Sequence, residues 1–186
     1  MRFIALDFET ATAQRDSVCQ IGYAVFEGGR EVEAGSQLVQ PPGNSYQWMN
    51  TRIHGIRDAD TAEAPVFAEV WPQLEALLHG QLVVAHNAPF DMGVLRTCCE
   101  RMHLPFPGFQ FACTLSLAKR QWRHLPNHKL STLAEAYAIP LHHHDAESDA
   151  LAAGHLAGRL FQELEIRRLE DFAAKHRMRL GSFHPM

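Results

Sequence analysis

Three short acidic segments of the sequence could do chemistry together: LDFET at 6–10, HNAPFD at 86–91 and HHHDAESDA at 142–150. Asp7 and Glu9 are two residues apart, so on a β-strand both side chains point to the same face. Acidic residues often lie at strand ends without having a catalytic or binding role. This pair alone therefore leaves both a structural and a functional role open.

Asp91 and Asp149 each begin an apolar stripe with helical spacing. Positions 91, 95, 98 and 102 read Asp, Leu, Cys and Met, and positions 149, 153, 156 and 160 read Asp, Ala, Leu and Leu. Helix N-termini stabilise carboxylates, which would account for one such residue. Two of them, both at inward-facing positions, are better explained by a shared site.

Four converging carboxylates would repel one another strongly, because their motifs contain no lysine or arginine to balance them. Mg²⁺ and Mn²⁺ prefer oxygen ligands, whereas Zn²⁺ prefers histidine and thiolate. Two such ions about 3.5–4 Å apart serve phosphoryl chemistry by activating a water and stabilising the leaving oxygen. The acids therefore predict a site for two divalent metal ions, Mg²⁺ or Mn²⁺.

The histidines at 142–144 precede the second of these helices. A histidine with an intrinsic pKa near 6.5 is suited to general base catalysis. A zinc site at 142–144 is disfavoured, because consecutive residues do not readily converge on one tetrahedral ion and no thiolate is close in sequence. His142 and His143 could be solvated loop residues or could contact the phosphate backbone of a nucleic acid, and we favour the first role.

The composition indicates one globular domain over residues 1–186, with a core to about 165 and a basic C-terminal helix and tail from about 166. The net charge of −4 argues against binding duplex DNA by bulk electrostatics. No apolar stretch reaches the roughly 20 residues of a membrane span, and Asp7 interrupts the N-terminal apolar run. The four cysteines show no CxxC spacing and read as reduced thiols. We therefore expect a cytoplasmic protein without membrane contact.

Hydrophobic periodicity predicts a mixed α/β fold. Strands are expected at 2–8, at 18–39 as a pair that turns at Gly28-Gly29, at 81–85 and at 109–113. Helices are expected within 66–80, 86–103, 114–122, 130–138, 146–165 and 167–178. The polar stretch 44–60 reads as irregular, and the final GSFHPM reads as a loose end. Three strands followed by alternating helices and strands favour a mixed sheet flanked by helices.

The ordered set LDFET, HNAPFD and HHHDAESD resembles the three exonuclease motifs of the DEDD superfamily, in its histidine-bearing DEDDh branch. The likeness is greatest to the DnaQ-like proofreading (epsilon) subunits of bacterial DNA polymerase III, and it extends to IHGI at 53–56 and KLSTLAEAYAI at 129–139. A DxE pair alone is a weak signal, but the ordered set at these spacings is specific. The resemblance implies a ribonuclease H-like fold with a mixed five-stranded sheet, and removal of nucleotides from single-stranded 3' ends.

The resemblance also implies roles for individual residues. Asp7, Glu9, Asp91 and Asp149 would hold the two divalent ions. His144, five residues before Asp149, matches the histidine that deprotonates the attacking water. The positions that would contact or border the terminal nucleotide are Thr10, His54, Asn87 and Phe90.

Two alternatives stay open at the level of sequence. One is a ribonuclease of the same superfamily that acts on RNA 3' ends, because the motifs do not indicate whether the site recognises the 2'-hydroxyl of RNA. The other is a noncatalytic nucleic-acid-binding or polymerase-associated module, which the presence of all four acids and His144 argues against. Only about twenty residues follow the last long helix, with no evident tail for docking onto a polymerase, so a free-standing exonuclease is favoured. The sequence carries no signal of oligomeric state.

Overall fold

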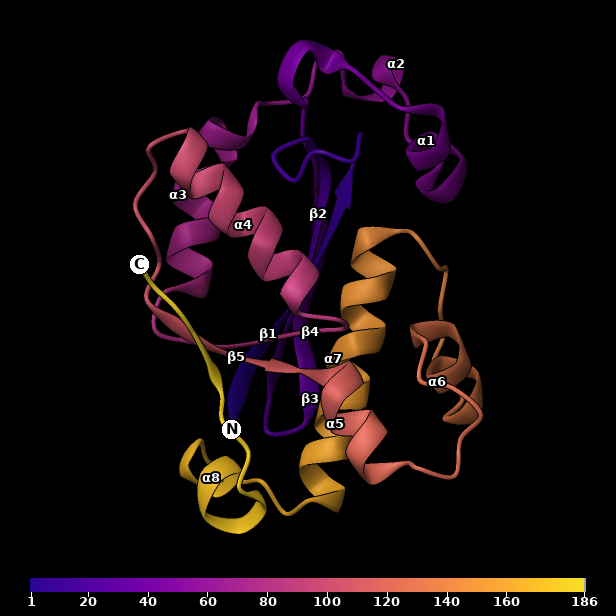
Figure 1. Ribbon diagram of the computed structural model, residues 1–186, viewed down its shortest axis with the longest axis vertical. Coiled ribbons are helices and arrows are strands. Elements are labelled where there is room, and N and C mark those ends of the chain that lie inside the picture. The colour runs from indigo at the N-terminus through magenta and orange to yellow at the C-terminus, as the bar shows by residue number, and fades with distance from the viewer. Residues whose placement is uncertain (186) are drawn as a thin grey trace.

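The computed structural model describes residues 1–185 and contains a mixed sheet with the strand order β3-β2-β1-β4-β5-β6 (Figure 1). β1 pairs antiparallel with β2 and parallel with β4, β2 and β3 are antiparallel, β4 and β5 are parallel, and β6 is antiparallel to β5. The strands are β1 (Arg2–Thr10), β2 (Val18–Glu27), β3 (Arg30–Leu38), β4 (Leu82–Ala85), β5 (Phe109–Cys113) and β6 (Gly181–Phe183).

Helices pack on both faces of this sheet, and others lie beyond its ends. Figure 1 shows α1 and α2 beyond the end of the sheet, and α8 at the opposite end of the molecule. Within residues 1–185, no helix combines the length and the apolar character needed to cross a membrane. The helices are α1 (Trp48–His54), α2 (Asp58–Thr61), α3 (Phe67–Leu78), α4 (Pro89–Arg101), α5 (Thr114–Gln121), α6 (Leu130–Ala136), α7 (Ala146–Glu163) and α8 (Glu170–His176).

β1 lies between two hydrophobic cores, because successive side chains of a strand point to opposite faces. Ile4, Leu6 and Phe8 belong to the core that contains the buried residues of α3 and α4. Phe3 and Ala5 belong to the second core, which is formed with α5, α6 and α7. The predicted central strand is thus covered on both sides, and its carboxyl end carries Asp7 and Glu9 on the face of α7.

Two glycine positions bring α7 close to the sheet. Gly22 pairs with Asp7 across β1 and β2, and a Cβ at Gly22 would lie 1.9 Å from the carbonyl oxygen of Ala146, the first residue of α7. A Cβ at Gly154, in the middle of α7, would lie 2.1 Å from the ring of Phe26. The missing side chains therefore let the start of α7 approach the strand position that carries Asp7.

The sheet has six strands, so the prediction of five was wrong. The sixth, β6, comes from the GSFHPM segment that was expected to be a loose end. Phe183 is 1% exposed and stacks on Phe109 with ring centroids 4.8 Å apart. A three-residue strand is too short to show a period of two, which explains why the pattern did not predict it. Residues after 165 pack on the core, where Ile166 and Phe172 are buried.

The stretch 44–60, expected to be irregular, contains α1 and α2. α1 shows no buried apolar face, because Trp48 is 70% and Met49 is 68% exposed. Polar contacts hold it instead: the backbone N–H of Gln47 donates to Ala11 O at 2.8 Å, and the Gln47 side chain accepts from the N–H of Ala13 at 3.0 Å. A helix anchored in this way has no hydrophobic period for the sequence to reveal.

Candidate active site

A cleft of about 450 Å³ lies at the carboxyl end of β1. It contains seven of the nine residues that the sequence singled out, drawn from β1, α1, α4, α7 and the loop before α7. The residues that line it are Asp7, Phe8, Glu9, Thr10, Thr12, Ala13, Arg15, Asn50, Ile53, His54, Phe90, His144 and Asp149. Asp91 and Asn87 are not part of this lining.

Three carboxylates meet on the floor of the cleft. Asp7, Glu9 and Asp149 each offer an oxygen, and these atoms all lie within 4.8 Å of one another. Asp7 and Glu9 reach the cleft from β1, whereas Asp149 comes from the first turn of α7 and is 4% exposed. The strand and the helix stripe therefore bring these acids together, as their spacing indicated.

Asp91 reaches the same region from the first turn of α4 and is 1% exposed. Its carboxylate accepts a hydrogen bond of 3.3 Å from the backbone N–H of Phe8. β4 ends at Ala85 while β1 continues to Thr10, so the Asp91 side chain supplies the acceptor for this N–H beyond the end of β4. This bond ties α4 to the part of β1 that lies between Asp7 and Glu9.

The pKa values of all four acids are raised. Burial is the largest cause for each, and repulsion between neighbouring carboxylates adds to it for Asp7, Glu9 and Asp91. For Asp149, hydrogen bonding and charge from His143 and His144 oppose the effect of burial. The pKa of Glu9 rises from 4.5 to about 8, with Asp149 and Asp91 as its strongest charged neighbours. The pKa of Asp91 rises from 3.8 to about 8, the pKa of Asp7 is raised well above its usual value, and that of Asp149 is also raised. The protein alone does not neutralise this cluster.

The donor set fits a divalent cation. In the described part of the chain, no lysine or arginine nitrogen lies within 4.0 Å of these four carboxylates, and the basic side chains within that distance are His143 and His144. Oxygen ligands with unbalanced negative charge are what Mg²⁺ and Mn²⁺ prefer. Asp7, Glu9 and Asp149 would hold such an ion, and Asp91 would adjoin it.

This cluster leads to a prediction for stability in the absence of metal. Glu9 and Asp91 keep a proton up to about pH 8 in the folded state, but only to their ordinary pKa values of 4.5 and 3.8 when unfolded. The folded state therefore binds more protons between about pH 4 and 8, and their contribution to stability is lost as the pH rises through this range. In EDTA, we expect the Tm to fall from pH 6 to pH 8, and Mg²⁺ or Mn²⁺ to reverse the fall.

Thermal unfolding followed by circular dichroism measures this effect, and Glu9→Gln is the matched control. Because glutamine does not ionise, the variant should show a flatter Tm profile in EDTA and a smaller Tm gain from the metal ion. A wild-type profile that is the same with EDTA and with Mn²⁺ at pH 8 would contradict the interpretation of the cluster as a cation site.

His144 lies in the loop before α7 with a φ of 68°, in the left-handed region. Its Nδ1 is 3.9 Å from Oε1 of Glu9, and its backbone N–H donates to Oδ2 of Asp149 at 3.2 Å. Burial lowers the pKa of His144, His143 lowers it further, and Asp149 opposes the shift. A pKa lowered in this way keeps the imidazole neutral near pH 7, as a proton acceptor must be.

His143 is an exposed loop residue, as predicted, but it also contacts the site, which was not predicted. Its Nδ1 lies 2.9 Å and 3.1 Å from the two carboxylate oxygens of Asp149, and its ring stacks on that of His144 with centroids 3.8 Å apart. The left-handed backbone at His144 folds the two neighbouring rings together, which sequence spacing does not reveal. His142 is exposed, as expected.

The other predicted residues occupy the cleft wall or its margin. Ile56 donates its N–H to Nδ1 of His54 at 3.1 Å, so Nε2 carries the hydrogen and faces Thr10 O at 3.3 Å. Burial lowers the pKa of His54. Phe90 is 38% exposed on the wall. Asn87 is exposed with a φ of 69° and lies outside the lining.

Asn50 is a residue of this wall that the sequence did not indicate. Its Nδ2 donates to Thr10 O at 2.8 Å, and together with Gln47 and His54 it attaches α1 to the end of β1. These three residues lie at spacings of three and four, on one side of α1. The sequence signal was this polar i, i+3, i+7 pattern, inside a stretch interpreted as irregular.

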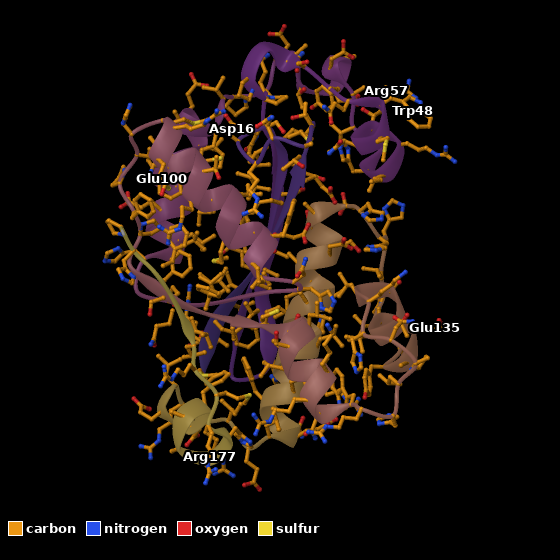
Figure 2. All side chains as sticks on the ribbon, viewed as in Figure 1. Asp16, Trp48, Arg57, Glu100, Glu135 and Arg177 are labelled. Carbon is orange, nitrogen blue, oxygen red and sulfur yellow. The ribbon has the colours of Figure 1, made fainter. Side chains whose placement is uncertain are left out.

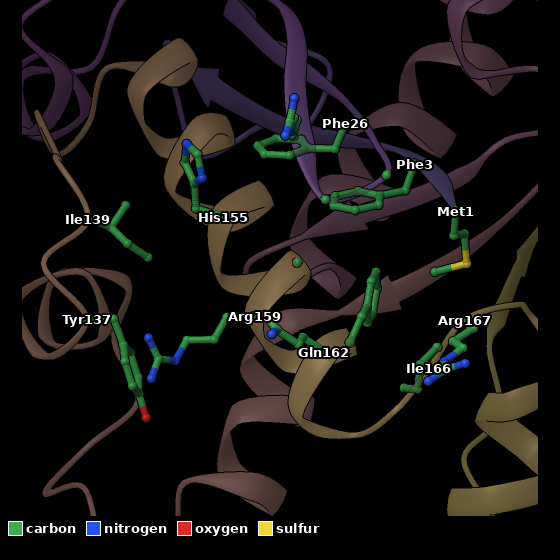
Figure 3. A pocket seen from close by; sticks show the side chains of 15 residues that line it. Met1, Phe3, Phe26, Tyr137, Ile139, His155, Arg159, Gln162, Ile166 and Arg167 are labelled. Carbon is green, nitrogen blue, oxygen red and sulfur yellow. The ribbon is translucent and has the colours of Figure 1, made fainter.

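A larger cavity, of about 740 Å³, lies elsewhere, over the amino end of β1 and the second half of α7. Figure 3 shows its labelled residues, with the Arg159 guanidinium beside the Tyr137 ring, 4.2 Å from the ring centroid, and Phe3 beside Phe26. Its lining contains no aspartate or glutamate. The carboxylate cleft therefore remains the candidate active site, although it is the smaller of the two.

Comparison with known proteins identifies the family of the chain. The sequence model of the RNase_T family, described as "Exonuclease", matches residues 4–157. The chain is 29% identical over 168 residues to the PolC-type DNA polymerase III of Caldanaerobacter subterraneus subsp. tengcongensis, covering 88% of this chain. It is 31% identical over 172 residues to that of Oceanobacillus iheyensis, covering 91% of this chain. In each case the match spans 12% of the polymerase.

Solved exonuclease structures share the fold. Exonuclease X in complex with 5' overhanging duplex DNA has a TM-score of 0.70 and 26% identity, over 87% of this chain and 91% of that chain. Exonuclease I in a product-bound structure has a TM-score of 0.76 and 20% identity, over 95% of this chain and 46% of that chain. The chain belongs to the exonuclease family, as a DnaQ-like member of the DEDDh branch with the ribonuclease H-like fold.

Proposed function

We propose that this exonuclease removes nucleotides one at a time from the 3' end of single-stranded DNA and that its activity depends on two divalent metal ions, Mg²⁺ or Mn²⁺. The observation that carries the proposal is the meeting of Asp7, Glu9 and Asp149 within 4.8 Å in a cleft that His144 also lines. Asp91, buried beside them, completes the ligand set. When bound, the ions would activate the attacking water and neutralise charge on the scissile phosphate and the leaving oxygen.

The chain's own residues supply the remaining steps. His144 accepts the proton of the water that attacks the last phosphodiester. The new bond joins the water oxygen to phosphorus, and the bond from phosphorus to the 3'-oxygen of the preceding nucleotide breaks. The products are a nucleoside 5'-monophosphate and a strand one nucleotide shorter. Asp149 holds His144 in place for this step, because its carboxylate accepts a hydrogen bond from the backbone N–H of His144.

The walls of the cleft suit the terminal nucleotide. Phe90 offers an exposed ring from α4, and Thr10 and His54 line the same cleft with polar side chains. Aromatic faces stack on bases with little sequence preference. Asn87 is proposed as a residue at the margin, since it is exposed in the turn that precedes Phe90.

Digestion of 3'-labelled strands tests the proposal. DNA and RNA strands of one sequence are incubated with the protein in Mg²⁺, in Mn²⁺ and in EDTA. We expect immediate release of the label from DNA as a mononucleotide with either metal, and none in EDTA. Faster release from RNA would make the protein a ribonuclease for RNA 3' ends instead. No release from any strand would favour a noncatalytic binding module.

The single-stranded 3' end is the proposed partner in this reaction, and a DNA polymerase is the candidate protein partner. The proposal of a polymerase partner rests on the relatives, which are named as PolC-type DNA polymerases. We also propose a cytoplasmic location. All four cysteines are free and three of them are buried, and reduced thiols are typical of that compartment.

A further inference from the structure

Arg15 is the residue of the cleft wall that the proposed reaction does not use. In the lining drawn from residues 1–185, it alone carries a permanent positive charge. Its side chain is exposed, and no carboxylate oxygen of the described chain lies within 4.0 Å of its guanidinium. An arginine that shares a cleft with three carboxylates, yet pairs with none of them, keeps its N–H donors available for another anion.

The loop that carries Arg15 is held in place at several points. Ala11 N–H donates to Ser17 O at 2.7 Å, and the Ser17 hydroxyl donates to Gln14 O at 2.6 Å. The next residue, Asp16, is 8% exposed and accepts a hydrogen bond from Arg101 of α4; Figure 2 shows it beside that helix. Arg15 therefore projects from a loop that is held in place, so the loop backbone loses little entropy when the side chain binds.

Gly93 of α4 makes room for the guanidinium. A Cβ at Gly93 would lie 1.7 Å from Nη1 and 2.6 Å from Cζ of Arg15, so the guanidinium occupies the space of the missing side chain. Glycine within a helix is destabilising relative to alanine. This position therefore carries a helix-destabilising residue where the cation lies, one turn after Phe90 of the cleft wall.

We propose that Arg15 binds the phosphate next to the scissile one in the substrate strand. The scissile phosphate must reach Asp7, Glu9 and Asp149, and the guanidinium lies more than 4.0 Å from their oxygens in the same cleft. The planar guanidinium donates two parallel hydrogen bonds to phosphate oxygens. The inference rests on the proposed function, because it takes the phosphodiester strand as the substrate of this cleft.

Steady-state kinetics with two substrates tests the position of the bound phosphate. One substrate is an oligothymidylate, and the other is the p-nitrophenyl ester of thymidine 5'-monophosphate, which has a single phosphate. For Arg15→Gln, we expect the KM for the oligonucleotide to rise about tenfold at low salt with little change in kcat. The slope of log(kcat/KM) against log[salt] should become shallower by about 0.7. Turnover of the ester should be unchanged.

Gly93→Ala is a second variant that keeps the charge but displaces it. The new Cβ must push the flexible end of Arg15 aside, so the KM for the oligonucleotide should rise as it does in Arg15→Gln. The Tm should not fall, because alanine favours the helix. Combining the two substitutions should raise the KM no further. Gly158→Ala in α7, where nothing lies within 4 Å of the added Cβ, and Arg30→Gln, outside the cleft, are the matched controls.

The outcomes separate this inference from the proposed function. If the wild-type protein does not shorten the strand, the proposed function fails whatever Arg15 does. If it shortens the strand and Arg15→Gln has the wild-type KM at low salt, Arg15 is not a phosphate ligand. An equal loss on both substrates would place Arg15 at the scissile phosphate and overturn the assignment to its neighbour.

Discussion

Asp7→Asn is expected to lower the rate of strand hydrolysis by about 10³-fold or more, because each divalent ion contributes several kcal/mol of charge stabilisation in the transition state. Asparagine has nearly the same shape but offers one neutral oxygen, so the variant should fold normally. It should also have a higher Tm than the wild type in EDTA at pH 8, since burial and the neighbouring acids disfavour the Asp7 carboxylate.

Kinetics of the purified variant measure the first effect, and thermal unfolding in EDTA at pH 8 measures the second. Glu135→Gln, which removes a carboxylate from the exposed surface of α6, is the control and should behave as the wild type. An Asp7→Asn protein with a tenth or more of the wild-type rate would show that the cluster does not hold the ions that the reaction needs.

His144→Gln has the second large expected effect. The loss of a general base is worth about 10²–10⁴-fold in kcat. Binding of Mn²⁺ should persist, because the carboxylates are intact. The wild-type rate should fall as the pH decreases through the lowered pKa of His144, since only the neutral imidazole accepts a proton. The variant should lack this acidic limb.

His143→Gln is the matched control, because the two rings stack and both lie beside the carboxylates. His143 contacts the oxygens of Asp149, so its loss should disturb a ligand and cost about tenfold, with the acidic limb preserved. If His143→Gln abolishes the acidic limb and His144→Gln does not, the roles of the two histidines must be exchanged.

The sequence predicted the acids and the fold for identifiable reasons. Asp7 and Glu9 follow a strand with period two, and Asp91 and Asp149 head stripes with a helical period, so local patterns were enough to turn all four inward. β1, β2, β4 and β5 lie where runs of apolar residues indicated. The mixed α/β fold with a ribonuclease H-like architecture is confirmed, with six strands instead of five.

The remaining features depend on contacts between distant segments or on single backbone angles. The position of His143 against Asp149 follows from the left-handed backbone at His144. The identity of a residue as histidine does not predict this backbone conformation. The attachment of α1 depends on hydrogen bonds to Thr10 O across about forty residues. Arg15 has a distinctive environment only because Gly93, on another element, leaves space for it.

A timed digestion of a 5'-labelled single strand of DNA by the wild type and by Asp7→Asn tests the central claim most directly. The claim is that this carboxylate cleft cuts strands from the 3' end. With Mg²⁺, the wild type should produce labelled strands that shorten one nucleotide at a time, and Asp7→Asn should leave the strand intact. Release of the label as a mononucleotide before any strands of intermediate length appear, or equal shortening by both proteins, would contradict it.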